Sequence, residues 1–330
     1  MIKRFTFVFA FVSLLCGCYD STDIEDIKNV ALIIADNDKI SYCTITTQSD
    51  EKIYGFKVYD IATDDLYYGI NSIEEQTGKQ VSLSHLEAIM FTTRCDYKAV
   101  KKIVNSLLEG TNSHPKVMTA FLVSDSAMFF DKLNIPSDTS VNKLIKNVFH
   151  NKFQATTECT AMDLSCAMNF DGAGERVPVV FADDDGNIKS NESMFVNNYG
   201  FAHIDEHTTQ FLNAISSDGE VYINYDNIIV PVKCRNIKFD LSQNNIDCNY
   251  VLEICSDSDK TSKQAITDFV KYVTDNITQK KKNGFDLLNL QGKIIKNFNS
   301  ISSFEKYIQN NGGINNWLKN INLNIEIEVE

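Results

Sequence analysis

The spacing of hydrophobic residues along the chain changes between the period of a strand and the period of a helix. An early apolar run, a turn and a second strand predict a β-hairpin. A helix, a strand, a strongly amphipathic helix and another strand follow. These predicted elements span residues 30–35, 40–47, 64–77, 81–91, 97–108 and 116–123. Their order predicts a crossover unit within an α/β layer.

Shorter apolar runs, separated by Asp, Asn and Gly turns, predict a mainly antiparallel block in the middle of the chain. The strands follow a predicted helix over 141–153 and span 177–181, 193–197, 221–225, 228–232, 236–240 and 250–254. A long amphipathic helix is then predicted over 261–282, where Thr261 and Gln264 fit a capping box. A short helix over 303–310 and a strictly alternating strand over 323–329 come last in the pattern.

These elements predict an α/β (α+β mixed) protein with several domains, built from mixed and antiparallel sheets with flanking helices. The length of the chain after residue 17 allows two or three domains. The N-terminal region is predicted over 18–185, with two subdomains split near residue 136, and the C-terminal α/β domain over 186–330.

The start of the chain has the pattern of an exported lipoprotein. Two basic residues precede an apolar run over 5–15, which is shorter than the roughly 20 residues that a membrane-spanning helix needs. Residues 15–18 then read Leu-Cys-Gly-Cys, which resembles a bacterial lipobox. We therefore predict a signal peptide over 1–17 and a lipid on Cys18, the alternative being an ordinary signal peptide with an incidental cysteine.

Charge and composition narrow the class of partner. Hydrophobic residues make up 43% of the chain and charged residues 23%, as in an ordinary globular protein. The formal net charge of −13 argues against binding to nucleic acid and against electrostatic docking on anionic lipids. Attachment to a membrane would therefore depend on acyl chains such as palmitate. The seven cysteines after Cys18 contain no Cys-x-x-Cys pair, and we interpret them as free buried thiols rather than a zinc site.

One short motif would support zinc-dependent catalysis. His203, Glu206 and His207 match His-x-x-Glu-His, in which two histidines on one face of a helix share a zinc ion and the glutamate acts as a base. The simpler interpretation is a strand followed by a helix with an acidic start. Residues 183–187 are interpreted as a hairpin turn rather than a calcium loop. No catalytic cluster, cofactor or metal is predicted.

Several segments of the sequence recur in one order in a known family. They are Cys18-Tyr19-Asp20 with 23–25, the strand 30–36, Ser84-His85 with 86–108, 177–180, 183–187 with 194–195, 261–282, 285–286, Trp317, and 323–329. In this order they resemble the Ger(x)C lipoproteins, the C subunits of spore nutrient-germinant receptors. Tyr19 stands where the family has Trp, and Ser84 where it has Gly.

The resemblance implies a non-enzymatic subunit of three α/β domains, held on the outer face of the spore inner membrane by the lipid on Cys18. Its partners would be the A and B membrane subunits of the receptor, and its role nutrient-triggered spore germination. Two alternatives stay open. One is a solute-binding lipoprotein of a transporter, which would need two similar lobes around a cleft. The other is a surface zinc peptidase using His203, Glu206 and His207.

Overall fold

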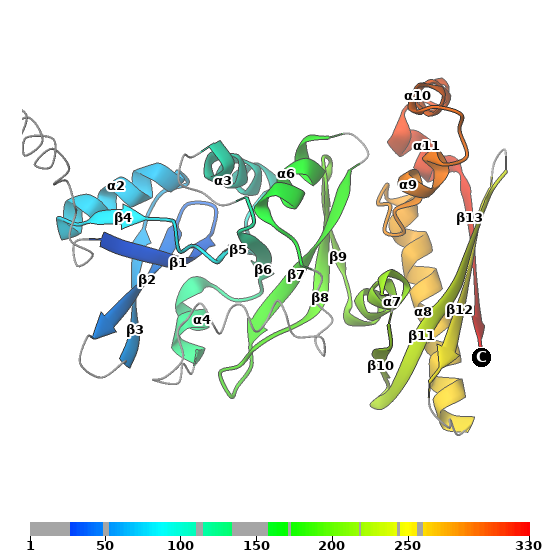
Figure 1. Ribbon diagram of the computed structural model, residues 1–330, viewed down its shortest axis with the longest axis horizontal. Coiled ribbons are helices and arrows are strands. Elements are labelled where there is room, and N and C mark those ends of the chain that lie inside the picture. Colours follow the sequence, from blue (N-terminus) through cyan, green and yellow to red (C-terminus); the bar gives the residue numbers. More distant parts are fainter. Residues whose placement is uncertain are drawn as a thin grey trace, which may run out of the picture.

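The computed structural model describes residues 27–48, 53–109, 115–133, 158–170, 173–217, 219–242, 245–255 and 260–330. The predicted signal peptide, Cys18 and the predicted helix over 141–153 lie outside these residues. Two sheets with flanking helices organise the described part of the chain, which confirms the mixed α/β class (Figure 1). Within that part, no helix is long and apolar enough to cross a membrane.

The first sheet has nine strands, with a parallel centre and antiparallel flanks. In spatial order it contains β3 (Ile53–Ile61), β2 (Ile40–Gln48), β1 (Ile27–Ala35), β5 (Ala88–Thr92), β6 (Met118–Leu122), β7 (Gly174–Ala182), β8 (Ile188–Asn197) and β9 (Gly200–Ile204), while β4 (Gln80–Ser82) pairs with β1. Strands β1, β5, β6 and β7 run parallel. The continuous apolar run predicted over 30–35 is fully buried because strands in the middle of a covered sheet have neighbours on both faces.

Helices cover both faces of this sheet (Figure 1). One face packs against three helices, α2 (Leu66–Thr77), α3 (Tyr97–Glu109) and α6 (Ala161–Asn169). The opposite face packs against Phe129 of α4 (Ser126–Lys132). The alternation of side chains along β5 explains this division, since Ile89 and Phe91 belong to the first core and Ala88 and Met90 to the second.

Helix α2 lies unusually close to the sheet at one point. Both ends of α2 are capped. The side chain of Asp65 accepts hydrogen bonds from the N–H groups of Tyr67 and Tyr68, and Gly78 ends the helix in the left-handed conformation with φ of 66°. Between them, Gly69 faces the buried ring of Tyr42 in β2, whose hydroxyl donates to the carbonyl of Leu66 at 2.7 Å. The absence of a side chain at Gly69 allows this contact.

The second sheet lies in the C-terminal part of the chain. It has the order β10 (Val221–Tyr225), β11 (Ile228–Leu241), β12 (Asn245–Ile254) and β13 (Asn322–Val329). The first three strands are antiparallel, as predicted, and β13 runs parallel to β12. Its helices are α7 (Glu206–Ser216), α8 (Lys260–Lys282), α9 (Leu290–Ile295), α10 (Ile301–Asn310) and α11 (Ile314–Asn320), and α7 and α8 share one core with the sheet.

Some details differ from the sequence predictions. The strands expected over 228–232 and 236–240 form one strand, β11, with an irregular register between Arg235 and Lys238. The capping box at Thr261 is wrong, because α8 already includes Lys260 and Thr261 is a helical residue. The predicted domain division at 185/186 falls in the turn between β7 and β8, which pair within the first sheet. The division into domains stays a prediction.

Candidate functional site

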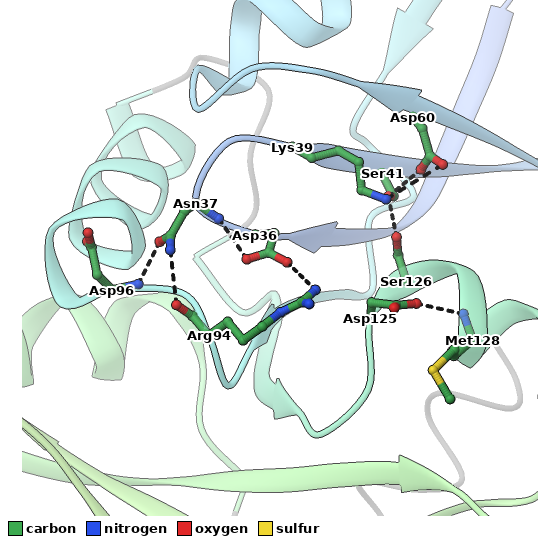
Figure 2. Close-up of polar contacts among 10 residues, drawn as sticks. All are labelled: Asp36, Asn37, Lys39, Ser41, Asp60, Arg94, Asp96, Asp125, Ser126 and Met128. Carbon is green, nitrogen blue, oxygen red and sulfur yellow. Dashed lines mark hydrogen bonds and ion pairs between the residues drawn. The ribbon is translucent and has the colours of Figure 1, made fainter.

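The carboxyl ends of the parallel strands bring polar side chains together (Figure 2). Asp36 follows β1 and Arg94 follows β5, and the Arg94 guanidinium lies 2.7 Å from the Asp36 carboxylate. The side chain of Asn37 donates to the carbonyl of Arg94 at 3.1 Å and accepts the N–H of Asp96 at 2.8 Å. Ligands of open α/β sheets bind at this end of the strands, so the cluster is the first place to look for a site.

Electrostatics and topology indicate that this cluster is structural. Burial favours a higher pKa for Asp36, but the backbone N–H of Asn37 and the Arg94 guanidinium outweigh it and lower the pKa. The carboxylate is therefore ionised and already paired. The parallel strands also follow one another in a single direction, β1, β5, β6, β7, without the reversal of strand order at which a binding crevice opens. The ion pair and hydrogen bonds of this cluster hold the turn after β1 against the loop before α3.

A second group of polar contacts in Figure 2 joins β2, β3 and α4. The hydroxyl of Ser41 lies 2.5 Å from the carboxylate of Asp60 and 2.8 Å from the hydroxyl of Ser126. A hydroxyl has one proton, so Ser126 donates to Ser41 and Ser41 donates to Asp60. Asp125 caps α4 by accepting the N–H of Met128 at 2.8 Å. These contacts hold α4 against the sheet.

The structure does not form the zinc geometry that the His-x-x-Glu-His motif requires. His203 lies in β9 and its ring is 2.9 Å from the carboxylate of Glu192, whereas Glu206 and His207 lie in the first turn of α7. The ring of His207 packs against aromatic rings, including that of Tyr225 at 4.9 Å between centroids. Asp205 caps α7 by accepting the N–H of Thr208. The simpler interpretation, a strand followed by a helix with an acidic start, is confirmed.

Residues 183–187 form the predicted hairpin turn between β7 and β8. The carboxylate of Asp183 accepts the N–H of Asp185 at 3.1 Å and that of Asn187 at 2.8 Å, and it pairs with Lys189 at 2.7 Å. The Lys189 ammonium, helped by Asn187, lowers the pKa of Asp183 from its usual 3.8 to about 2.

The cysteines of the described residues are free thiols. Cys43, Cys95, Cys159 and Cys248 are buried, and Cys255 is exposed. Burial raises the pKa of Cys43 to about 12 and, with help from nearby carboxylates, that of Cys95 to about 12. Such thiols are protonated at neutral pH and act as small apolar side chains.

Sequence reasoning missed the contacts of Asp36, Asn37 and Arg94. A signal for them exists in the chain, because polar residues directly after two buried parallel strands meet at one edge of a sheet. These polar residues predict a shared cluster only once β1 and β5 are known to be neighbouring strands.

Comparison with known proteins places this fold in a defined class. No family model and no curated protein matches the sequence. A solved structure does match, and it confirms the mixed α/β architecture and the Ger(x)C-like fold that the sequence predicts. That structure is the crystal structure of the GerBC protein, to which this chain is similar with a TM-score of 0.53 and 13% identity. The match covers 88% of this chain and 92% of the other.

Proposed function

We propose that this protein is a lipid-anchored, non-enzymatic subunit of a spore germinant receptor, which acts with A and B membrane subunits in nutrient-triggered germination. The observation that carries the proposal is the fold it shares with the GerBC protein over 88% of the chain. The lipobox at residues 15–18 and the ordered set of family-like segments support it independently.

In this proposal the protein is held on the outer face of the spore inner membrane by Cys18. Each buried CH₂ of an acyl chain contributes about 0.8 kcal/mol, and two chains give stable anchoring where one gives marginal binding. Eight residues lie between Cys18 and Ile27, the first residue of β1, so nine residue steps join the two. At about 3.3–3.6 Å per extended residue, this segment places the start of β1 within roughly 30 Å of the anchor.

The alternative of a solute-binding lipoprotein has less support. It would need two similar α/β lobes. The described residues form a nine-stranded sheet with a parallel centre and a four-stranded, mainly antiparallel sheet, and these do not resemble each other.

The first experiment deletes the gene from its own spore-former. We expect the spores to lose their response to one class of nutrient, while germination by agents that bypass nutrient receptors stays normal. Normal germination with every nutrient tested would refute the proposed role.

The second experiment complements the deletion with Cys18→Ala and, as a matched control, Cys16→Ala. We expect Cys18→Ala to abolish labelling by a clickable fatty acid, to release the protein from the membrane fraction and to leave the nutrient response lost. Cys16→Ala keeps the cysteine that receives the lipid and should restore all three. Full function of an unlipidated Cys18→Ala protein would contradict the anchoring part of the proposal.

A further inference from the structure

A cavity of about 320 Å³ lies between one flank of the first sheet and helices of the C-terminal part of the chain. Its walls come from β7 and β8 of the first sheet, from the end of α7, and from the segment between α8 and α9 with α9 itself. The volume is at the lower end of the range found for small-molecule pockets, about 300–1,000 Å³. The cavity has space for a molecule larger than a few waters, whose share of liquid volume is about 30 Å³ each.

Arg176 of β7 is held in this wall by neutral partners. Its guanidinium donates to the side-chain oxygen of Asn213 at 2.8 Å and to the hydroxyl of Ser216 at 3.4 Å. Both belong to the last turns of α7, where the helix dipole favours a cation. Burial lowers the pKa of Arg176 to about 10, so the group is still charged at neutral pH. In the described part of the chain it forms no ion pair, and Glu175 acts on it only at longer range.

Lys293 of α9 is a second cation of the wall. Its ammonium donates to the hydroxyl of Tyr250 at 3.3 Å, and it too forms no ion pair with a described residue. The nearby carboxylate of Asp286, by contrast, is satisfied by the N–H groups of Leu290 at 2.9 Å and Gln291 at 3.2 Å. Arg176 and Lys293 are thus cations of the wall without an ion pair to a described residue, while Glu175 is a carboxylate of the same lining that accepts the backbone N–H of Arg176 at 3.2 Å.

Much of the remaining lining is polar, and Phe195, Leu287 and Leu288 add an apolar patch to it. Phe195 is 6% exposed and its ring stands perpendicular to that of Phe285, with centroids 6.1 Å apart. Leu287 and Leu288 are also buried. A mainly polar lining with an apolar patch matches a small molecule that has one charged end and one apolar end.

We propose that this cavity binds a small organic monocarboxylate. Its carboxylate accepts hydrogen bonds from the guanidinium of Arg176, and its apolar part lies against Phe195 and Leu288. Arginine is suited to this role because its N–H groups match the two oxygens of a carboxylate. A dianion such as phosphate fits less well, because Glu175 and Asp286 bring two carboxylates to the same lining. This site is independent of the proposed receptor function.

The test measures binding to the full-length protein in detergent by calorimetry and saturation-transfer NMR. The probes are benzoate and butyrate, with the uncharged benzamide and butyramide as matched controls and inorganic phosphate as the dianion. We expect benzoate or butyrate to bind with a Kd of about 1 mM or below and each amide about tenfold more weakly. Saturable binding of neither carboxylate, equal binding of the amides, or tighter binding of phosphate would overturn the proposal.

Variants locate the binding. Arg176→Gln should weaken carboxylate binding by about tenfold or more, because it removes the charge-assisted hydrogen bonds. Arg94→Gln removes a guanidinium outside the cavity and should leave binding unchanged. Glu175→Gln should strengthen binding by removing a nearby negative charge, and it serves as the second test should Arg176→Gln not fold. Unchanged binding in a folded Arg176→Gln protein, or weaker binding in Glu175→Gln, would refute the assignment.

Discussion

The contact between Gly69 and Tyr42 provides a test of how closely α2 packs against the first sheet. A Cβ atom on Gly69 would lie 2.1 Å from the hydroxyl oxygen of Tyr42 and 2.7 Å from two carbons of its ring. These distances are far inside van der Waals contact. Because Tyr42 is fully buried, its ring has no free space into which to move. Gly69→Ala therefore forces either the ring or the helix to shift.

The expected loss follows from three contributions. Alanine is favoured over glycine inside a helix by about 1 kcal/mol, which opposes the effect. Inserting an atom into a packed core costs about 1–3 kcal/mol. Displacing the phenol also weakens its hydrogen bond to Leu66, which contributes about 0.5–1.5 kcal/mol. The net expectation is a decrease of about 2 kcal/mol in the free energy of unfolding.

Urea denaturation of the wild type and variants measures this decrease. Asn71→Ala places the same side chain at an exposed position of the same helix and should leave the stability unchanged or slightly raised. In a Tyr42→Phe background, the cost of Gly69→Ala should shrink but not vanish, because the ring carbons still obstruct the Cβ atom. A Gly69→Ala protein as stable as the wild type would refute the reasoning.

Two further predictions concern polar contacts. The low pKa of Asp183 means that its contribution to stability is present above about pH 3.8 and is lost as the pH falls toward 2. Asp183→Asn should therefore lower the stability at neutral pH and flatten its dependence between pH 4 and 2 in denaturation curves; an unchanged acid dependence would contradict this. Asn37→Ala removes both contacts with the loop at Arg94 and Asp96, should cost about 1–2 kcal/mol, and should speed amide hydrogen exchange at Asp96. Wild-type exchange there would show that the loop is held by other contacts.

The sequence predicts the elements whose hydrophobic period is long and regular. The strand around 30–35, the helix over 97–108 and the long helix over 261–282 all lie close to their predicted bounds. In the two helices one set of side chains faces a core along the whole element, and in the strand every side chain from 30 to 35 is buried, so each pattern is visible without knowledge of the partner.

Other elements depend on partners that the sequence does not reveal. Strand β3 contains Gly55, Lys57 and Asp60, and it forms because β2 offers an edge to pair with. Helix α6 is short, although Thr160 and Asp163 form a capping box at its start that is visible in the sequence. The strand order was not predicted, because β6 and β7 are neighbours in space but far apart in the chain.

Candidate sites are harder to predict than elements. The His-x-x-Glu-His match depends on a helix over 203–207, and Asp205 begins the helix too late for that geometry. The cavity combines Arg176 with residues more than a hundred positions later, such as Lys293. Neither residue has a local signal of binding, so only the packing of α9 near β7 reveals the pair.

The position of β1 has a mechanical consequence. The chain enters the first sheet through this strand, which lies inside the sheet with β2 on one side and β4 and β5 on the other. A pull along the chain ahead of Ile27 therefore loads hydrogen bonds on both sides of β1 in shear, so that many must break together. If the chain instead entered through a terminal hairpin or helix, the hydrogen bonds of that element would break one after another. A tether attached ahead of β1 thus transmits force into the centre of the fold rather than peeling away its edge.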